Sequence, residues 1–217
     1  MRVILALVAA ALVAAIGIVA FNRFYTDFDD LSDTDRQILS EIDVFFKANS
    51  EQAVFEGYDL ENKTILAIGN GLKSAYLVNP SGEINSVFAA KINMPQDSAL
   101  TVYRLSFLAP QTLAMRLEAG NFNTIGKVYK AFGNEVYFMK YNRSESLEAV
   151  NSSKHFINLL THEAFHYYMQ NQWSDGSRFD GELSEEDIDL LAEEYDALAG
   201  IQEELLRDEP RTETLLR

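Results

Sequence analysis

The first residues of the chain limit what the rest of it can form. Val3 to Phe21 is an uninterrupted run of nineteen apolar residues, preceded by Arg2. At 1.5 Å per residue, a helix of this length extends about 28 Å, which is close to the hydrocarbon thickness of a bilayer. We therefore predict a membrane anchor over residues 1–21, with the amino terminus inside the cytoplasm and the remainder of the chain outside it.

The same segment has a second interpretation, a signal peptide cleaved after Ala20. In that case Ile18 and Ala20 occupy the positions that the signal peptidase recognises. The apolar run is long for a signal peptide and Ile18 is large for its position, so the anchor is favoured. Both interpretations place the rest of the chain outside the cytoplasm, in a bacterial periplasm or at a cell surface, and cleavage would release it as a secreted protein.

Composition narrows the class of protein further. The 217 residues are 47% hydrophobic, which suits one domain of moderate size with a substantial core. The formal net charge of −15 argues against nucleic acid or an anionic lipid surface as a partner. The chain has no cysteine, and this excludes disulfides, thiolate zinc sites and cysteine nucleophiles.

Two of the chain's three histidines stand four residues apart, as His162 and His166, with Glu163 between them. Residues at that spacing lie on the same face of a helix, about 6 Å apart along its axis. Both imidazoles can then reach one zinc ion, because a zinc–nitrogen bond is about 2.0–2.1 Å long. Glu163 projects beside the ion, where a base acting on water is needed. The spacing predicts one zinc ion held by His162 and His166, with Glu163 as the catalytic base.

A catalytic zinc site needs three protein ligands and one position open to water. The remaining histidine, His155, precedes His162 by seven residues, about 10 Å along a helix, so it is expected to start the helix or to pack. Met169 and Gln172 occupy the positions that the metzincin pattern gives to Gly and His. The third ligand should therefore be a carboxylate.

A predicted final helix, about residues 185–206, offers one such carboxylate. At 100° per residue its apolar positions fill one arc, formed by Ile188, Leu190, Leu191, Tyr195, Leu198, Ile201 and Leu205. Glu194 falls inside this arc, whereas Glu193 falls on the opposite side. A carboxylate that faces a core is costly unless it is paired or bound to a metal, so Glu194 is the predicted third ligand. The alternatives are a Glu194 whose stem bends out to water and one that pairs with a buried Arg.

Four other acids remain alternatives for the third ligand. Glu185 and Glu186 stand at separations from His166 that resemble those of peptidases with a Glu ligand. Both lie in the first turn of the final helix, however, where acidic residues are expected for reasons of the helix dipole alone. Asp175 and Asp180 lie in the loop before that helix.

The remaining pattern predicts an α+β domain with a mixed or antiparallel sheet. In the first half of the chain we expect a helix after Ser32 that ends near Asn49, strands at 63–69 and 72–78 around Asn70-Gly71, and strands around 86–92 and 100–108. A helix at 111–119 and two strands within 128–141 around Gly133-Asn134 should follow. The metal helix is expected at 153–172 with Ser152 or Ser153 as N-cap, and a loop at 173–183 leads to the final helix. The predicted domain covers residues 32–209, between a connector at 22–31 and a loose tail at 210–217.

The chain resembles the zincin metallopeptidases and, within them, the gluzincins, whose third ligand is a Glu from a following helix. The resemblance rests on the motif from His162 to His166 and, more loosely, on Glu193-Glu194-Tyr195-Asp196. It covers about the last 65 residues. It implies a zinc peptidase that acts on a peptide or protein substrate, with zinc on His162, His166 and Glu194 and with Glu163 as general base.

Further residues are candidates for supporting roles. A second donor to the oxyanion would come from Tyr167, Tyr168, Tyr195 or His155. Asn158 and Gln170 are candidates for orienting the ligand imidazoles. The stretch from Glu135 to Tyr141 would either lay an extended peptide along an edge strand or simply belong to the sheet.

Two other functions fit the same residues. One is a non-catalytic envelope domain that keeps a structural zinc and binds a partner through its surface. The other is a zinc hydrolase that acts on a non-peptide amide, such as a cell-wall amide. A structural zinc closes all four positions with protein ligands, whereas a catalytic one stays open to water.

Overall fold

The structure, a computed structural model, describes residues 2–24, 26–51, 55–70, 75–147, 152–172 and 183–205. Its contacts divide the chain into two compact units, residues 1–175 and residues 176–217. The first unit holds the N-terminal helix and an α+β body, and the second holds the final helix. The predicted domain at 32–209 thus extends over parts of both units.

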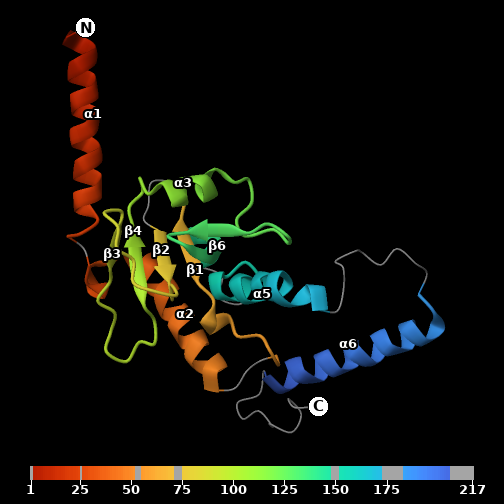
Figure 1. Ribbon diagram of the computed structural model, residues 1–217. Helices are drawn as coiled ribbons and strands as arrows, with labels where there is room; N and C mark the ends of the chain where they lie inside the picture. The colour runs from red at the N-terminus through yellow and green to blue at the C-terminus, as the bar shows by residue number, and fades with distance from the viewer. Residues whose placement is uncertain are drawn as a thin grey trace. The chain divides into compact units, whose positions relative to one another are not determined.

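The elements follow the predicted order along the chain (Figure 1). In the first unit they are α1 (Arg2–Phe21), α2 (Asp33–Glu51), β1 (Ile65–Gly69), β2 (Ala75–Val78), β3 (Ala89–Lys91), β4 (Val102–Leu105), α3 (Pro110–Leu117), β5 (Tyr129–Ala131), β6 (Asn134–Tyr141), α4 (Arg143–Ser146) and α5 (Phe156–Met169). The second unit contributes α6 (Glu185–Leu205). Short 3-10 turns occur at Phe28–Asp30, Leu60–Asn62 and Gln170–Gln172.

The strands form one six-stranded mixed sheet in the order β3-β4-β2-β1-β6-β5. β1 pairs parallel with β6, and the other neighbours pair antiparallel, which confirms the α+β class. The predicted hairpin at Gly133 is tight, because Ala131 pairs with Asn134. Phe132 and Gly133 both have positive φ, 50° and 81°, as a two-residue type I′ turn requires.

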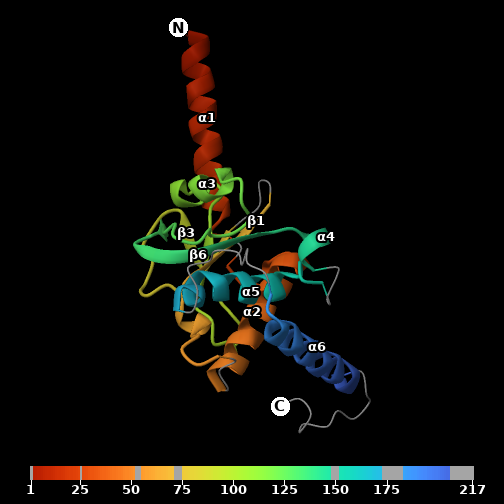
Figure 2. The ribbon, with the colours of Figure 1, turned by 90° about the vertical axis from the view of Figure 1, so that its right-hand side faces the viewer.

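Both faces of the sheet are buried, each under a different helix layer. Along β1, Ile65 and Ala67 enter the core cluster that contains the inner sides of α2 and α5. Leu66 and Ile68 enter a second cluster on the opposite face, which includes side chains of α3. The two views show the same layering, with α3 on one side of the sheet and α2 and α5 on the other (Figures 1 and 2). The motif helix therefore lies on the face away from α3.

The apolar N-terminal run forms a helix as predicted. Within α1, the window Ile4–Phe21 is long and apolar enough to cross a membrane, a test that a signal sequence also passes. The connector after it is held against the sheet. Buried Asn22 donates from Nδ2 to the carbonyl of Arg104 at 2.9 Å, and Asp27 forms a parallel bridge with Asn93. The predicted connector is therefore an ordered part of the body.

The start of the motif helix differs from the prediction. Ser152 and Ser153 were expected to cap it, but α5 begins at Phe156 with His155 in the N-cap position. The ring of His155 is buried and lies 2.9 Å from the carboxylate of Glu41 on α2. Packing between the two helices, rather than a serine cap, therefore sets where α5 begins.

A buried carboxylate joins α2 to the sheet. Asp35 accepts hydrogen bonds from the hydroxyls of Tyr76, at 3.0 Å, and Tyr141, at 2.6 Å. The backbone N–H of Asp35 donates to the hydroxyl of Ser32 at 3.3 Å, which confirms the predicted cap of this helix. A carboxylate in this position is tolerated because hydrogen bonds replace its water.

In the second unit, α6 has the predicted bounds and cap. The backbone N–H of Asp187 donates to the hydroxyl of Ser184 at 3.1 Å, and the Asp187 carboxylate accepts from the backbone N–H of Ser184 at 2.9 Å. This hydrogen bonding with Ser184 lowers the pKa of Asp187. Glu194 lies near the middle of the helix.

The buried tyrosines predict a loss of stability in alkali. Burial raises the pKa values of Tyr58, Tyr137, Tyr141 and Tyr168 above that of a free phenol. In the unfolded chain they ionise at about pH 10, whereas the folded chain keeps their protons. The unfolded state then binds fewer protons, so the free energy of unfolding should fall as the pH rises above about 10, with this contribution intact below it.

Denaturant unfolding between about pH 8 and pH 11 checks this expectation. Tyr137→Phe is the informative variant, because the Tyr137 hydroxyl is buried and has no hydrogen-bond partner among the described residues. It should cost little at pH 8 and should flatten the alkaline fall. Parallel curves for the variant and the native chain would contradict the assignment.

Candidate metal centre

His162 and His166 meet on one face of α5. Their Nε2 atoms lie 3.1 Å apart, and the two rings stand edge to face with centroids 4.6 Å apart. Two nitrogens that each lie about 2.05 Å from a tetrahedral ion are about 3.3 Å apart. The pair is thus arranged to share one zinc ion with little movement of either ring, so these two side chains match two of the three ligands that the motif predicts.

A neighbouring amide fixes the orientation of one imidazole. Nδ1 of His166 lies 2.7 Å from Oε1 of Gln170, one turn further along the chain. Because an amide oxygen only accepts, the proton sits on Nδ1, and Nε2 keeps its lone pair for a metal. The predicted orienting role of Gln170 is matched by this contact. Asn158 instead donates from Nδ2 to the carbonyl of Ser152, at 3.2 Å.

Glu163 follows His162 and is half-buried, so its carboxylate is neither free in solvent nor sealed in the core. Its charge lies close enough to Tyr137 on β6 to affect the pKa of that tyrosine. Burial chiefly, and then the charge of Glu163, raises the pKa of Tyr137. On a helix, position 163 lies about 60° from position 166 around the axis. The carboxylate therefore projects beside the histidine pair, as a base that serves the same site requires.

The third histidine, His155, packs between helices α5 and α2 and is not part of the metal site. The Nε2 atom of His155 is committed to Glu41, and the side chain is 3% exposed. This confirms the predicted role in starting and packing α5. It also removes His155 from the candidate oxyanion donors, because a buried and paired ring cannot face a substrate.

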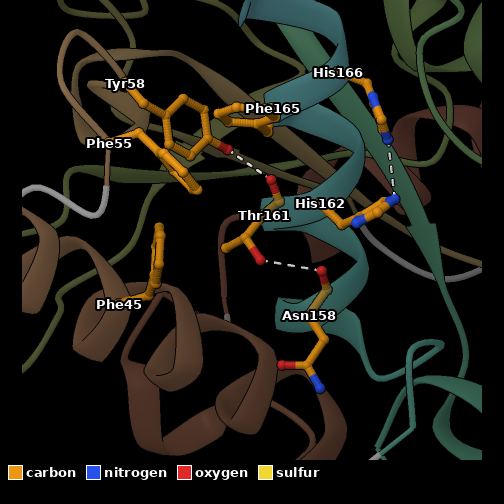
Figure 3. Close-up of a pocket in the computed structure, with 8 residues that line it drawn as sticks. All are labelled: Phe45, Phe55, Tyr58, Asn158, Thr161, His162, Phe165 and His166. Atoms are coloured by element: carbon orange, nitrogen blue, oxygen red, sulfur yellow. Dashed lines mark hydrogen bonds between the residues drawn. The ribbon is translucent and has the colours of Figure 1, made fainter. Parts of the chain in front are cut away.

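A cavity of about 520 Å³ opens next to the histidines (Figure 3). It is lined by Phe45, Phe55, Tyr58, Asn158, Thr161, His162, Phe165 and His166. The hydroxyl of Tyr58 donates to the carbonyl of Thr161 at 2.8 Å, and this bond ties the segment after α2 to the motif helix. The rings of Phe55 and Phe165 pack with centroids 4.7 Å apart. The histidine pair thus borders a largely aromatic pocket.

Sequence reasoning missed most of this pocket. Phe45 lies on α2, and Phe55 and Tyr58 follow it, about a hundred residues before the motif. No local pattern links these aromatics to a helix so distant in the chain, since only the tertiary fold brings α2 beside α5. Phe55 is half accessible to solvent, and this sign of a binding surface exists only in the folded chain.

The two tyrosines after the motif have packing partners. Tyr167 donates from its hydroxyl to the carbonyl of Lys127 at 3.3 Å, and the ammonium of Lys63 lies 5.1 Å from the ring centroid of Tyr168. Both rings also pack against Tyr137. As candidates for an oxyanion donor they stay predictions, as does Tyr195 on α6.

The stretch from Glu135 to Tyr141 is not an edge strand. It forms most of β6, which lies between β1 and β5 in the sheet. Of the two predicted roles, membership of the sheet is the correct one. β1 pairs with Tyr137–Tyr141, β5 pairs with the start of the strand, and Phe122 bridges to Met139. Any extended peptide laid beside the motif helix would have to pair elsewhere.

The structure does not bring a third ligand to the histidines. Within the described ranges, no group of three or more His, Asp or Glu side chains is placed to hold a metal. Glu194, and its alternatives Glu185 and Glu186, lie in α6 of the second unit, so their part in the site stays a prediction. Asp175 and Asp180 lie outside the described residues.

No family model matches the chain, and neither a curated protein nor a solved structure matches it. A function for this chain must therefore be inferred from the residues of α5 and from the pocket beside them.

Substitution of each histidine should distinguish the two predicted metal ligands, His162 and His166, from His155, which packs between helices. We expect the native chain to purify with zinc, and His162→Ala and His166→Ala each to lose it, because each removes one of two adjacent nitrogens. His155→Ala should keep its zinc but lose about 1–3 kcal/mol of stability, since Glu41 is left without its partner. Elemental analysis of the purified proteins and denaturant unfolding measure the two effects. Retention of full zinc by either of the first two variants would contradict the site.

Proposed function

We propose that this chain is a zinc-dependent hydrolase, a membrane-tethered peptidase that acts outside the cytoplasm. The observation that carries the proposal is the 3.1 Å separation of the two Nε2 atoms on α5, next to an open aromatic pocket. Glu163 follows His162 on the same helix. Geometry of this kind suits one ion shared by two imidazoles with room for a substrate. The apolar helix α1 supports the tether.

In this proposal each residue has one role. His162 and His166 hold the zinc through Nε2, and Glu194 is the third ligand. Zinc bound there supplies a Lewis acid that lowers the pKa of water toward about 7. Glu163 accepts the proton of the attacking water and delivers it to the leaving nitrogen as the amide carbon–nitrogen bond breaks. Gln170 keeps the ring of His166 in the tautomer that leaves Nε2 unprotonated.

The pocket suggests which substrates fit. Its aromatic side chains come from α2, from the segment after it and from α5, and they offer an apolar surface within reach of the histidines. A buried apolar side chain contributes about 1.5–3 kcal/mol to binding or folding when it leaves water. We propose that a peptide binds with a bulky apolar side chain in this pocket.

Glu163→Gln tests the catalytic role directly. The amide keeps the shape of the side chain but cannot take a proton, so hydrolysis of a mixed peptide library should fall by roughly 10²–10⁴-fold while zinc stays bound. Glu83→Gln, at an exposed position, is the matched control and should leave the rate unchanged. Unchanged turnover in Glu163→Gln would end the proposal. A native chain that holds zinc but cleaves nothing would favour the structural-zinc alternative.

A second pair of variants tests the third ligand. Glu194→Ala should lower zinc occupancy, because this carboxylate is the proposed third ligand. Glu193→Ala removes the same group from the opposite side of the helix and should leave occupancy intact. Equal occupancy in both variants would move the assignment to Glu185 or Glu186, which the corresponding alanine variants would then distinguish.

A further inference from the structure

An apolar surface of the body faces the last turns of α1. A cavity of about 540 Å³ is bounded on one side by helix residues that include Ile16 and Val19, and on the other by Val87, Phe88 and Leu108. Val87 is 58% exposed, although its neighbours on the sheet are buried. Apolar atoms thus line both sides of this cavity. In water these apolar side chains would be exposed to solvent.

The position of this surface along α1 is informative. Ile16 precedes the end of the candidate span at Phe21 by five residues, about 7.5 Å of helix. Interfacial segments bury their apolar faces about 5–10 Å into the boundary between headgroups and acyl chains. If α1 spans a bilayer, Val87, Phe88 and Leu108 lie at the depth of that boundary and not in bulk water.

The body is held at this depth by the connector. The buried side-chain amide of Asn22 binds the carbonyl of Arg104, and the guanidinium of Arg23 reaches the carbonyl of Ser86 at 3.4 Å. Both bonds come within two residues of the end of α1. Arg23 also borders the cavity, at the level where a long basic side chain reaches the headgroups.

Helix α3, which begins two residues after Leu108, presents further exposed apolar side chains. Its outer positions, Pro110, Ala114 and Leu117, are exposed, and Leu117 is 86% exposed. These residues recur at helical spacing on one side of α3, while Met115 on the other side enters the core. Both views show α3 on the side of the sheet from which α1 leaves the body (Figures 1 and 2).

We propose that this apolar surface, formed by Val87, Phe88, Leu108 and Leu117, rests in the interfacial layer of the bilayer that α1 spans. The sheet face that carries α3 then lies toward the lipid, and α5 with its histidines lies on the face away from it. The lipid contact depends on α1 remaining in the membrane, and it does not depend on hydrolysis. Combined with the proposed function, it restricts the substrate to a soluble or cell-wall molecule outside the membrane.

The absence of native cysteine allows a direct test with single labels. An environment-sensitive fluorophore is attached to Val87→Cys or Leu117→Cys in the full chain, which is reconstituted into phosphatidylcholine vesicles that contain nitroxide-labelled lipid. Val44→Cys on α2 is the matched control, because Val44 is similarly exposed, at 67%, and lies in the layer across the sheet. Leu12→Cys, within α1, reports whether the span is inserted.

The expected result is a blue shift and lipid quenching at Val87, Leu117 and Leu12, with neither effect at Val44. Quenching is required at both surface positions. If either behaves like Val44 while Leu12 is quenched, the body does not touch the bilayer and the inference fails. Absence of quenching at Leu12 overturns it as well, because α1 is then not in the membrane. Both failures leave the zinc and Glu163→Gln tests unaffected.

Discussion

The burial of one side of α5 against the sheet determines where the histidines point. Phe156 and Leu160 are almost fully buried in the cluster that contains Tyr137 and Tyr141. Each such side chain contributes about 1.5–3 kcal/mol, whereas a hydrogen bond such as the one between His166 and Gln170 contributes about 1 kcal/mol net. Packing therefore dominates the orientation of the helix. The motif needs only to occupy the side that packing leaves free.

Buried polar contacts join α5 and α2 to the rest of the body. His155 meets Glu41 at the start of α5, Tyr58 binds the Thr161 carbonyl in its middle, and Asp35 joins α2 to two strands through tyrosine hydroxyls. Each contact satisfies a buried polar group that would otherwise be costly. Because these bonds join elements distant in sequence, they fix α2 beside α5, and this arrangement creates the aromatic pocket.

Much of the fold was predictable because its signals are local. Gly133 marked a hairpin, Ser32 and Ser184 marked helix starts, and the spacing of His162 and His166 implied a shared ligand position. The strands on either side of Asn70-Gly71 pair antiparallel as expected, with Ile68 opposite Ala75, while Gly71 itself lies outside the described residues. Features that depend on tertiary contact were not predictable. The start of α5 follows His155 and its partner on α2, the internal place of β6 follows from its parallel pairing with β1, and the pocket joins residues about a hundred positions apart. Glu194 was selected by periodicity alone, and periodicity cannot say what a helix face meets.

The pairing of Asp27 with Asn93 has a mechanical consequence. A chain tethered by a loose linker samples a hemisphere whose radius grows with linker length, and it can reach partners at many heights above a membrane. Here the backbone hydrogen bonds of Phe28 and Asn93 fasten the connector directly to the body. With α1 in a bilayer, the body would stay at one fixed height relative to the membrane surface. Targets would have to diffuse to that elevation, so spacing from the lipid would itself act as a filter on what is processed.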